Sequence, residues 1–182
     1  MTESVEAIED DAESYLDKSP DAGRIGKAVE YLIAASCILA SGATLNVSTS
    51  MVDDEGVDLV FHRRGSSATL SAQVKARLTT GKHVQQGRFL ASVRQQTFRP
   101  RDDLYLLFVV ANAEKATFGP VWLVPSAAFS ERARPVGARQ NLRFSASMAE
   151  GTEDQWRRYR LEHDQLVAKL LERLERADGP TK

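Results

Sequence analysis

The stretch that decides the fold is GVDLVFHRRGSSATLSAQVKARL, residues 56–78. Two segments in it, 57–63 and 68–78, read as short β-strands, and the intervening RGSS is prone to form a turn. We therefore predict a β-hairpin. If Gly65-Ser66 is a two-residue turn with glycine first, the numbers of paired residues sum to 131, which places Asp58 directly opposite Gln73.

The alternation of side chains along a strand assigns each residue of this hairpin to one face. The residues expected to face the core are Val57, Leu59, Phe61, Ala72, Val74 and Ala76. Asp58, Gln73 and Lys75 are then expected on the other face, so that a carboxylate, an amide oxygen and an ammonium converge. A register slip of one residue would separate them.

This set of groups has the chemistry of a divalent-metal site. Mg²⁺ prefers hard oxygen ligands, which the Asp58 carboxylate, the Gln73 amide and the Val74 backbone carbonyl would supply. Lys75 can position an attacking water and stabilise charge that grows on a phosphoryl group. Glu30 is the one acidic residue between Gly23 and Gly42 and would complete the site from the preceding helix.

Each of these residues also has a plainer interpretation. Glu30 taken alone is a common kind of solvated helix acid, and Lys75 is the kind of charge that protects an edge strand from aggregation. Asp58 lies inside VDLVF, where aspartate is disfavoured in a strand, so it calls for a reason such as function, an edge or a turn.

The remaining segments predict an α/β (α+β) architecture, with a mixed sheet flanked by helices in the order α-α-β-β-β-α-β-β-α-(β)-α. One helix is expected over 20–40, with Ser19 as its N-cap and Gly42 at its C-terminal end. The other predicted helices are an acidic one over 3–17, one within 81–99, one over 125–132 and one over 152–177. The other predicted strands cover 43–48, 104–111, 116–124 and 141–145.

The net charge of −1 hides a strong asymmetry along the chain. Residues 1–61 carry 3 basic and 13 acidic side chains, whereas residues 62–143 carry 14 basic and 4 acidic ones. Arginine can hold phosphate through two parallel hydrogen bonds, so a polyanion such as DNA is a candidate partner. The alternative is that the basic middle pairs with the acidic first part, within the fold or across a homodimer.

Length and composition bound the class of protein. With 182 residues, a single domain over 1–182 is expected, with the segments 1–18 and 152–177 as peripheral additions. The chain shows neither a signal peptide nor a membrane span, so we expect a cytoplasmic protein without a membrane partner. The one cysteine, Cys37, excludes an intramolecular disulfide and a structural zinc site built on cysteines.

The order of these features over residues 21–80 resembles the PD-(D/E)XK nuclease superfamily, whose restriction-endonuclease-like fold is shared by Holliday-junction resolvases and many bacterial defence nucleases. The resemblance implies a helix glutamate (Glu30), an aspartate at the start of a strand (Asp58), and Gln73-Val74-Lys75 in the (D/E)-X-K place. It further implies an Mg²⁺- or Mn²⁺-dependent endonuclease that hydrolyses DNA phosphodiester bonds, in defence or in DNA processing.

One departure from the pattern matters for activity. Gln73 replaces the usual carboxylate, which removes one negative charge and weakens cation binding unless Glu30 or the pair Asp53/Asp54 compensates. The alternative function is therefore an inactive DNA-binding or protein-interaction module with the nuclease fold. In either case a partner protein or a homodimer would supply specificity, and the arginines expected to hold the nucleic-acid backbone are Arg63, Arg77, Arg88 and Arg94.

Overall fold

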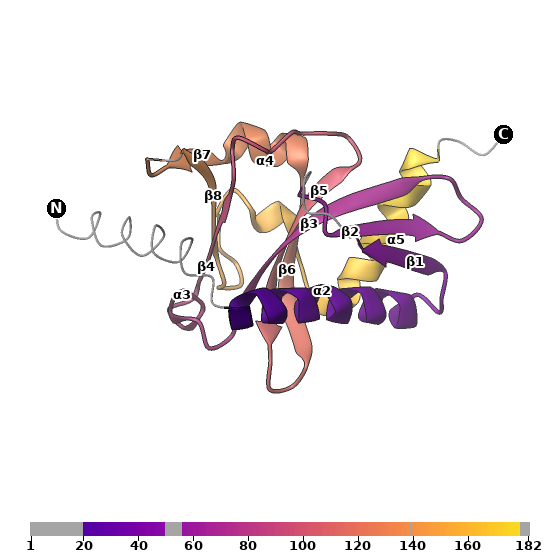
Figure 1. Cartoon of the computed structure of the whole chain (residues 1–182), viewed down its shortest axis with the longest axis horizontal. Coiled ribbons are helices and arrows are strands. Elements are labelled where there is room, and N and C mark those ends of the chain that lie inside the picture. The colour runs from indigo at the N-terminus through magenta and orange to yellow at the C-terminus, as the bar shows by residue number, and fades with distance from the viewer. Residues whose placement is uncertain (1–19, 50–55, 139, 179–182) are drawn as a thin grey trace.

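A computed structural model describes residues 20–49, 56–138 and 140–178 (Figure 1). The helix expected over 3–17, the cap Ser19 and the acids Asp53 and Asp54 lie outside the described residues. The helices are α2 (Pro20–Ala40), α3 (Lys82–Gln85), α4 (Ser126–Arg132), the 3-10 turn η1 (Arg157–Tyr159) and α5 (His163–Ala177). The strands are β1 (Leu45–Thr49), β2 (Leu59–Arg63), β3 (Thr69–Leu78), β4 (Arg88–Val93), β5 (Leu104–Asn112), β6 (Thr117–Pro125), β7 (Arg134–Val136), β8 (Asn141–Ser147) and β9 (Arg160–Leu161).

The strands form two sheets. The large sheet has the order β1-β2-β3-β5-β6-β9, and the small sheet has the order β4-β8-β7. Only the β3–β5 pair of the large sheet is parallel, which requires a crossover, and α3 and β4 lie within that connection. The predicted fold class, a mixed sheet flanked by helices, is confirmed.

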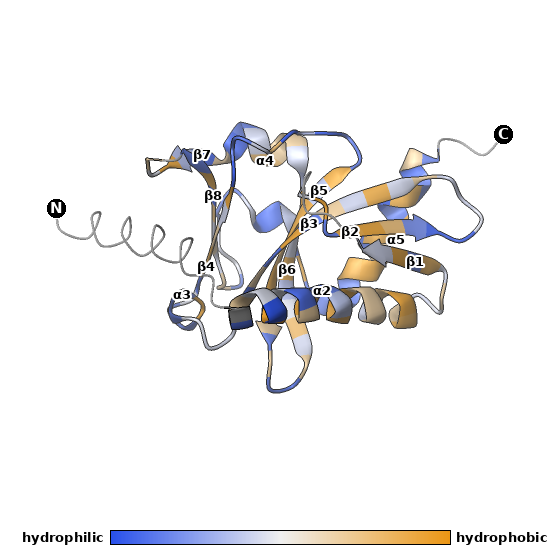
Figure 2. Ribbon diagram, in the orientation of Figure 1, coloured by the Kyte–Doolittle hydropathy of each residue, from blue (hydrophilic) through white to orange (hydrophobic). Residues whose placement is uncertain are grey.

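Two hydrophobic cores cover opposite faces of the large sheet. Along β5, Leu107 and Val109 join one core while Leu106 and Phe108 join the other, as the alternation of a strand dictates. Helices α2 and α5 close the first core, and the small sheet, α4 and Trp156 close the second. Because both faces of β5 are buried, its sequence is a continuous apolar run, which is visible as orange ribbon in Figure 2.

The second core covers only part of its face of the large sheet. It takes residues from β5 and β6 but none from β1, β2 or β3. On those three strands the same face carries mainly polar side chains, including those of Asn46, Ser48, His62, Gln73 and Lys75. Among the described residues, the second core therefore ends beside β3; we call the β1-β2-β3 part of this face the uncovered half of the large sheet, and the edge of the small sheet beside it the step.

Helix α2 agrees with the prediction at both ends. It spans Pro20–Ala40, and the chain leaves it through Gly42, whose φ of 58° is readily accessible only to glycine. Val29, Ile33 and Cys37 form its buried side, so Cys37 packs as a small apolar residue. Among the helices of the described residues, none has the length and apolar composition that crossing a membrane requires.

The helix predicted within 81–99 is wrong over most of its length. A four-residue helix, α3, occupies Lys82–Gln85, and Arg88–Val93 forms strand β4. In β4 the residues Phe89, Ala91 and Val93 are buried and alternate with more exposed ones, a strand period that the glutamine-rich flanks obscure. Arg88, one of the arginines predicted to hold nucleic acid, therefore lies on a sheet and not on a helix.

The long helix predicted over 152–177 is also wrong in its first part, since α5 begins at His163. Trp156 and Tyr159 pack in the second core, whereas Leu166 and Leu170 pack in the first. A single straight helix cannot serve both faces of a sheet. The chain instead passes the sheet edge through η1 and β9, which pairs with β6.

A polar cluster fastens the starts of β3 and β5. Ser71 donates from its backbone to the Asp103 carbonyl at 2.8 Å and from its hydroxyl to Asp103 Oδ2 at 3.1 Å. Arg101 Nε donates to Asp103 Oδ1 at 3.1 Å, and the buried Ser126 hydroxyl donates to the Arg101 carbonyl at 2.7 Å. Burial raises the pKa of Asp103, but the bonds from Arg101 and Ser71 outweigh it, and the pKa lies below its ordinary value.

Asp103→Asn should lower the free energy of unfolding by about 1 kcal/mol at neutral pH, because it weakens two side-chain hydrogen bonds of a carboxylate that is still partly in solvent. A lowered pKa stabilises the fold above the ordinary value of 3.8 and loses that effect as the pH falls through the folded value. The difference from wild type should therefore shrink below pH 3.8. Urea unfolding at several pH values measures it, with exposed Asp102→Asn as control.

Candidate active site

The register of the β2–β3 hairpin is the one predicted from the sequence. Leu59 pairs with Ala72 and His62 with Thr69, so the residue numbers of each pair sum to 131. The predicted two-residue turn is wrong, however. Arg63 and Ser66 close a turn through a 3.1 Å backbone bond, with Gly65 third in it at a φ of 78°. The whole loop between the last paired residues, His62 and Thr69, is nevertheless centred on the Gly65–Ser66 peptide bond, as the predicted turn was, so the register is the same.

Asp58 lies just beyond the last regular pair of the ladder. Its backbone N–H donates to the Ala72 carbonyl at 2.9 Å, so Asp58 is not directly opposite Gln73 as expected. Its carboxylate instead accepts the backbone N–H of Val74 through Oδ2 at 2.6 Å. The side chain thus takes the place of the missing strand partner and is held beside the Gln73–Lys75 segment.

Gln73 is brought to the same place by Gly56. A Cβ atom on Gly56 would lie 2.7 Å from Gln73 Nε2, so the amide occupies the space that a side chain at position 56 would need. Gly56 also has a φ of 68°, which favours glycine for a second reason. The segment Gly56–Asp58 therefore contacts the segment Gln73–Lys75 through both its first and its last residue.

The third strand presents its polar residues on one face. Gln73 and Lys75 lie beside Leu106 and Phe108 in the parallel register, and both of those β5 residues face the second core. Arg77 lies two residues further along β3, so its side chain is on the same face, and it is exposed. These three side chains consequently line the uncovered half of the large sheet, next to the step formed by the small sheet.

The Val74 backbone carbonyl lies on the side of β3 that faces β2. In a strand the N–H and C=O of one residue point to the same side, and the Val74 N–H points to Asp58. Strand β2 begins only at Leu59, which pairs with Ala72, so Val74 has no regular strand partner on that side.

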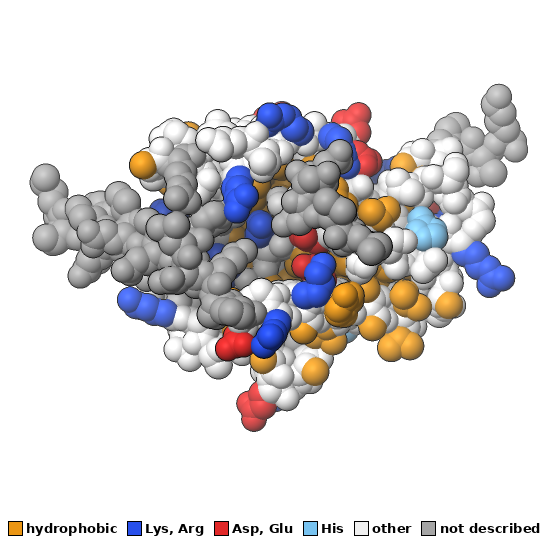
Figure 3. All heavy atoms as spheres, viewed as in Figure 1, with side chains coloured by type: hydrophobic (Ala, Val, Ile, Leu, Met, Phe, Trp, Pro, Cys, Tyr) orange, Lys and Arg blue, Asp and Glu red, His pale blue; other side chains and the backbone are white. Residues whose placement is uncertain are grey.

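Glu30 lies in the middle of helix α2 and pairs with Lys27 one turn earlier. Glu30 Oε2 accepts from Lys27 Nζ at 2.6 Å, and the Glu30 side chain is only 13% exposed. The hydrogen bond to Glu30 is the main reason that the pKa of Lys27 is raised, against the opposing effect of burial, and the charge of Asp58 contributes in the same direction. Lys27 is therefore coupled electrostatically to both carboxylates. Figure 3 shows acidic and basic side chains near one another along α2 and above its middle.

The donor atoms of this site suit a hard cation in type. Asp58 and Glu30 offer carboxylates, Gln73 an amide oxygen and Val74 a carbonyl, which is the ligand chemistry of Mg²⁺ and Mn²⁺. Within residues 20–49, 56–138 and 140–178 no group of three or more His, Cys, Asp or Glu side chains gathers as a cation cage. By the chemistry of their oxygen atoms, these residues could hold a cation such as Mg²⁺, which commonly keeps several of its waters.

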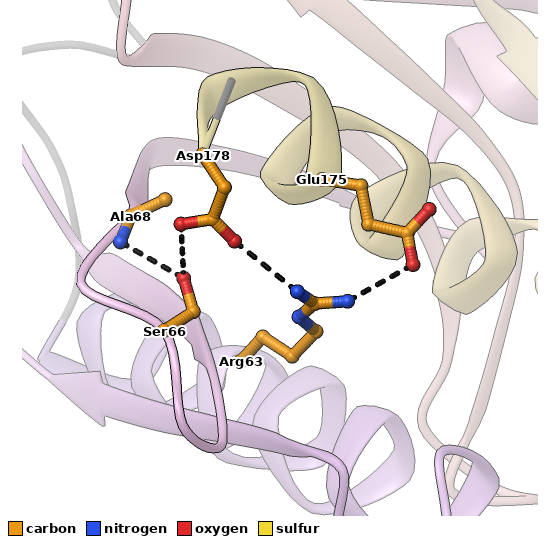
Figure 4. A network of polar contacts seen from close by, with 5 residues as sticks. All are labelled: Arg63, Ser66, Ala68, Glu175 and Asp178. Carbon is orange, nitrogen blue, oxygen red and sulfur yellow. Dashed lines mark hydrogen bonds and ion pairs between the residues drawn. The ribbon is translucent and has the colours of Figure 1, made fainter. Parts of the chain in front are cut away.

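Arg63 lies away from this set and joins the hairpin to the end of α5 (Figure 4). Its guanidinium contacts Glu175 Oε1 at 3.1 Å and Asp178 Oδ2 at 3.2 Å, and Ser66 Oγ donates to Asp178 Oδ1 at 2.6 Å. Of the other arginines predicted to hold nucleic acid, Arg88 lies on β4 and Arg94 is exposed directly after it.

Sequence reasoning did not assign a role to two residues of the site. Gly56 precedes Asp58 by two residues, but its contact with Gln73 depends on how the segment before β2 lies across β3. Lys27 forms an i,i+3 pair with Glu30 that the spacing could have indicated. Its coupling to Asp58 could not be read from spacing, because it depends on the packing of α2 on the sheet.

Comparisons with known proteins give little beyond this. No protein-family model and no curated relative matches the chain. Among solved structures, the bacterial homing endonuclease I-Ssp6803I is similar at a TM-score of 0.48 and 18% identity, over 79% of this chain and 91% of that one. MepB is similar at a TM-score of 0.36 and 11% identity, over 71% of this chain and 94% of that one. At these values neither similarity bears on function, which we infer from the chain's own residues.

Gly56→Ala should displace the Gln73 amide, whereas Gly65→Ala should not, because nothing lies within 4 Å of a Cβ at Gly65. Both glycines have positive φ, so both variants should lose about 1 kcal/mol of unfolding free energy. The side-chain amide NMR signals of Gln73 report the difference. Equal signals in the two variants would show that Gln73 does not lie over Gly56.

Proposed function

We propose that the chain is a divalent-metal-dependent nuclease that hydrolyses DNA phosphodiester bonds. The observation that carries the proposal is the 2.6 Å bond from the Val74 N–H to Asp58 Oδ2, which holds a carboxylate against the Gln73–Lys75 segment. A carboxylate, an amide oxygen and an ammonium in one place are the groups that phosphodiester hydrolysis needs. The helix acid Glu30 supports the same assignment, because its pair with Lys27 is coupled to Asp58.

In this proposal Asp58, Gln73, the Val74 carbonyl and Glu30 hold Mg²⁺ or Mn²⁺. The cation, when bound, would withdraw charge from the phosphate and favour attack by water. Lys75 positions the attacking water and stabilises the negative charge that grows on the phosphate oxygens. Asp58 is oriented for its role by the hydrogen bond that its Oδ2 accepts from the Val74 N–H.

DNA as the substrate is supported by charge. The uncovered face of the large sheet continues from Lys75 to Arg77, and the middle of the chain, residues 62–143, carries 14 basic and 4 acidic side chains. Phosphate contacts of this kind position a nucleic acid without reading its sequence. A cytoplasmic role in bacterial defence or DNA processing, with a homodimer or a partner protein supplying specificity, belongs to the same proposal.

The second candidate function is a DNA-binding module without catalysis. It is favoured by one residue, Gln73, whose neutral amide stands where the superfamily pattern has a carboxylate. Such a module would bind DNA with a steep salt dependence, without a metal requirement and without product.

Lys75→Ala should reduce the rate of DNA cleavage by about a hundred-fold or more, because it removes the ammonium group that is proposed to stabilise the developing charge on the phosphate. The measurement compares labelled linear, supercoiled, single-stranded and branched DNAs with Mg²⁺, with Mn²⁺ and with EDTA. Asp58→Ala should have the same effect, and the exposed Lys115→Ala is the matched control. Unchanged cleavage in Lys75→Ala and Asp58→Ala would refute the assignment.

Gln73→Glu separates the two candidate functions. If the wild type binds DNA but forms no product, restoring the carboxylate should create metal-dependent cleavage, since it adds the missing negative ligand. If the wild type already cleaves DNA, the same change should lower the Mg²⁺ concentration needed for half-maximal rate. A titration of cleavage rate against Mg²⁺ distinguishes these outcomes.

A further inference from the structure

The outward face of the small sheet carries a second cluster of basic residues. In β4 and β8 the buried residues include Phe89, Ala91, Leu142 and Phe144, so the alternate residues point away from the core. The outward residues that bear polar groups are Arg88, Ser92, Arg134, Asn141, Arg143, Ser145 and Ser147. We call them the arginine–serine face. No strand residue on this face is acidic.

The strand register concentrates the positive charge. Arg143 on β8 lies directly opposite Arg134 on β7 and, on its other side, opposite Ser92 on β4. Like charges directly opposite each other destabilise an antiparallel pair. An anion that contacts both guanidinium groups would offset this repulsion.

The remaining arginine of the face is held in position by the sheet. Arg88 Nη2 donates to Ser145 Oγ on the neighbouring strand at 2.8 Å. A guanidinium has five N–H donors, so this bond leaves others for a ligand. Arg88 and Arg134 are both exposed and lie on opposite edge strands of the sheet, one on β4 and one on β7. The face thus offers basic groups across its whole width.

The arginine–serine face and the candidate active site point in the same direction. Gln73 and Lys75 lie on the side of the large sheet that bears the second core, and the small sheet packs on that side with its buried face toward the core. The outward face of the small sheet is therefore directed away from the large sheet, as are Gln73 and Lys75. A rod-like polyanion that rests on the small sheet can extend over the step to the uncovered half of the large sheet.

We propose that the arginine–serine face is the surface that docks duplex DNA, by contacts of Arg88, Arg134 and Arg143 with the phosphate backbone. The inference rests on the proposed function and adds to it where the duplex lies. Serine hydroxyls and the Asn141 amide serve as short neutral donors to phosphate oxygens between the arginines.

The test measures how the affinity for a short labelled duplex depends on salt, by fluorescence anisotropy in EDTA so that no cleavage occurs. Each phosphate contact that is lost should lower the slope of log affinity against log salt by about 0.9. Arg88→Gln/Arg134→Gln should therefore reduce the slope by about 1.8. The control is Arg176→Gln on α5, a 65% exposed arginine on the opposite side of the large sheet, which should keep the wild-type slope.

Two further variants separate binding from folding. Arg134→Lys keeps the charge and should keep the wild-type slope, whereas Arg134→Gln should lower the slope and leave Tm unchanged or higher, because it relieves the repulsion with Arg143. A wild-type slope in the double variant would overturn the proposal. So would an equal loss of slope in Arg176→Gln, or binding of heparin through this face without binding of the duplex.

The outcome for the docking surface is independent of the outcome for catalysis. Duplex binding that depends on Arg88 and Arg134, without cleavage under any metal condition, would refute the nuclease and leave the docking surface in place. Cleavage that requires Lys75, with wild-type salt dependence in the double variant, would do the reverse.

Discussion

The hydrogen bond from the Val74 N–H to the Asp58 carboxylate replaces a strand partner that Val74 lacks, because β2 begins only at Leu59. A backbone N–H left without a partner in this half-buried position would cost about as much as a lost hydrogen bond. Asp58 removes that cost, and the same hydrogen bond fixes the position of the Asp58 carboxylate. The position of the carboxylate relative to Gln73 and Lys75 follows from this one contact, and Gly56 completes it by leaving room for the Gln73 amide.

The unequal covering of the large sheet gives the site its place. Strand β5 is apolar on both faces and needs a core on each side, so the small sheet packs above it. Strand β3 is apolar on one face only, because Gln73, Lys75 and Arg77 alternate with Val74 and Ala76. The second core therefore stops between β5 and β3. The polar groups of the proposed chemistry lie at that boundary.

Charge is distributed over this architecture in two parts with different roles. Near Asp58, Lys27 and Glu30 form a close pair, so acidic and basic groups balance each other where a cation is proposed to bind. On the small sheet, Arg134 and Arg143 lie side by side among serines, without an acidic strand residue. Arg63 belongs to neither part. It ties the hairpin to α5 through Glu175 and Asp178, a structural role within one face of the sheet.

The sequence by itself determined the elements whose signals are local. The apolar period and terminal glycine of α2, the alternation of the hairpin and the continuous apolar run of β5 each depend on neighbouring residues, so they could be predicted. The hairpin register could be predicted as well, because any loop centred on the same peptide bond gives the same pairs. The choice of Asp58, Gln73, Lys75 and Glu30 as one candidate site came from the same local patterns.

Only the tertiary structure decided which contacts join these elements. Strand β4 pairs with β8, about fifty residues away, and that pairing overrides the weak local pattern around Arg88. The segment before α5 changes faces of the sheet because Trp156 belongs to one core and Leu166 to the other. The contact of Asp58 with Val74 in place of a pairing with Gln73, and the meeting of Arg134 with Arg143, likewise depend on where separate strands end and which neighbours they find. Such long-range pairings depend on packing over the whole chain, which no local window of sequence contains.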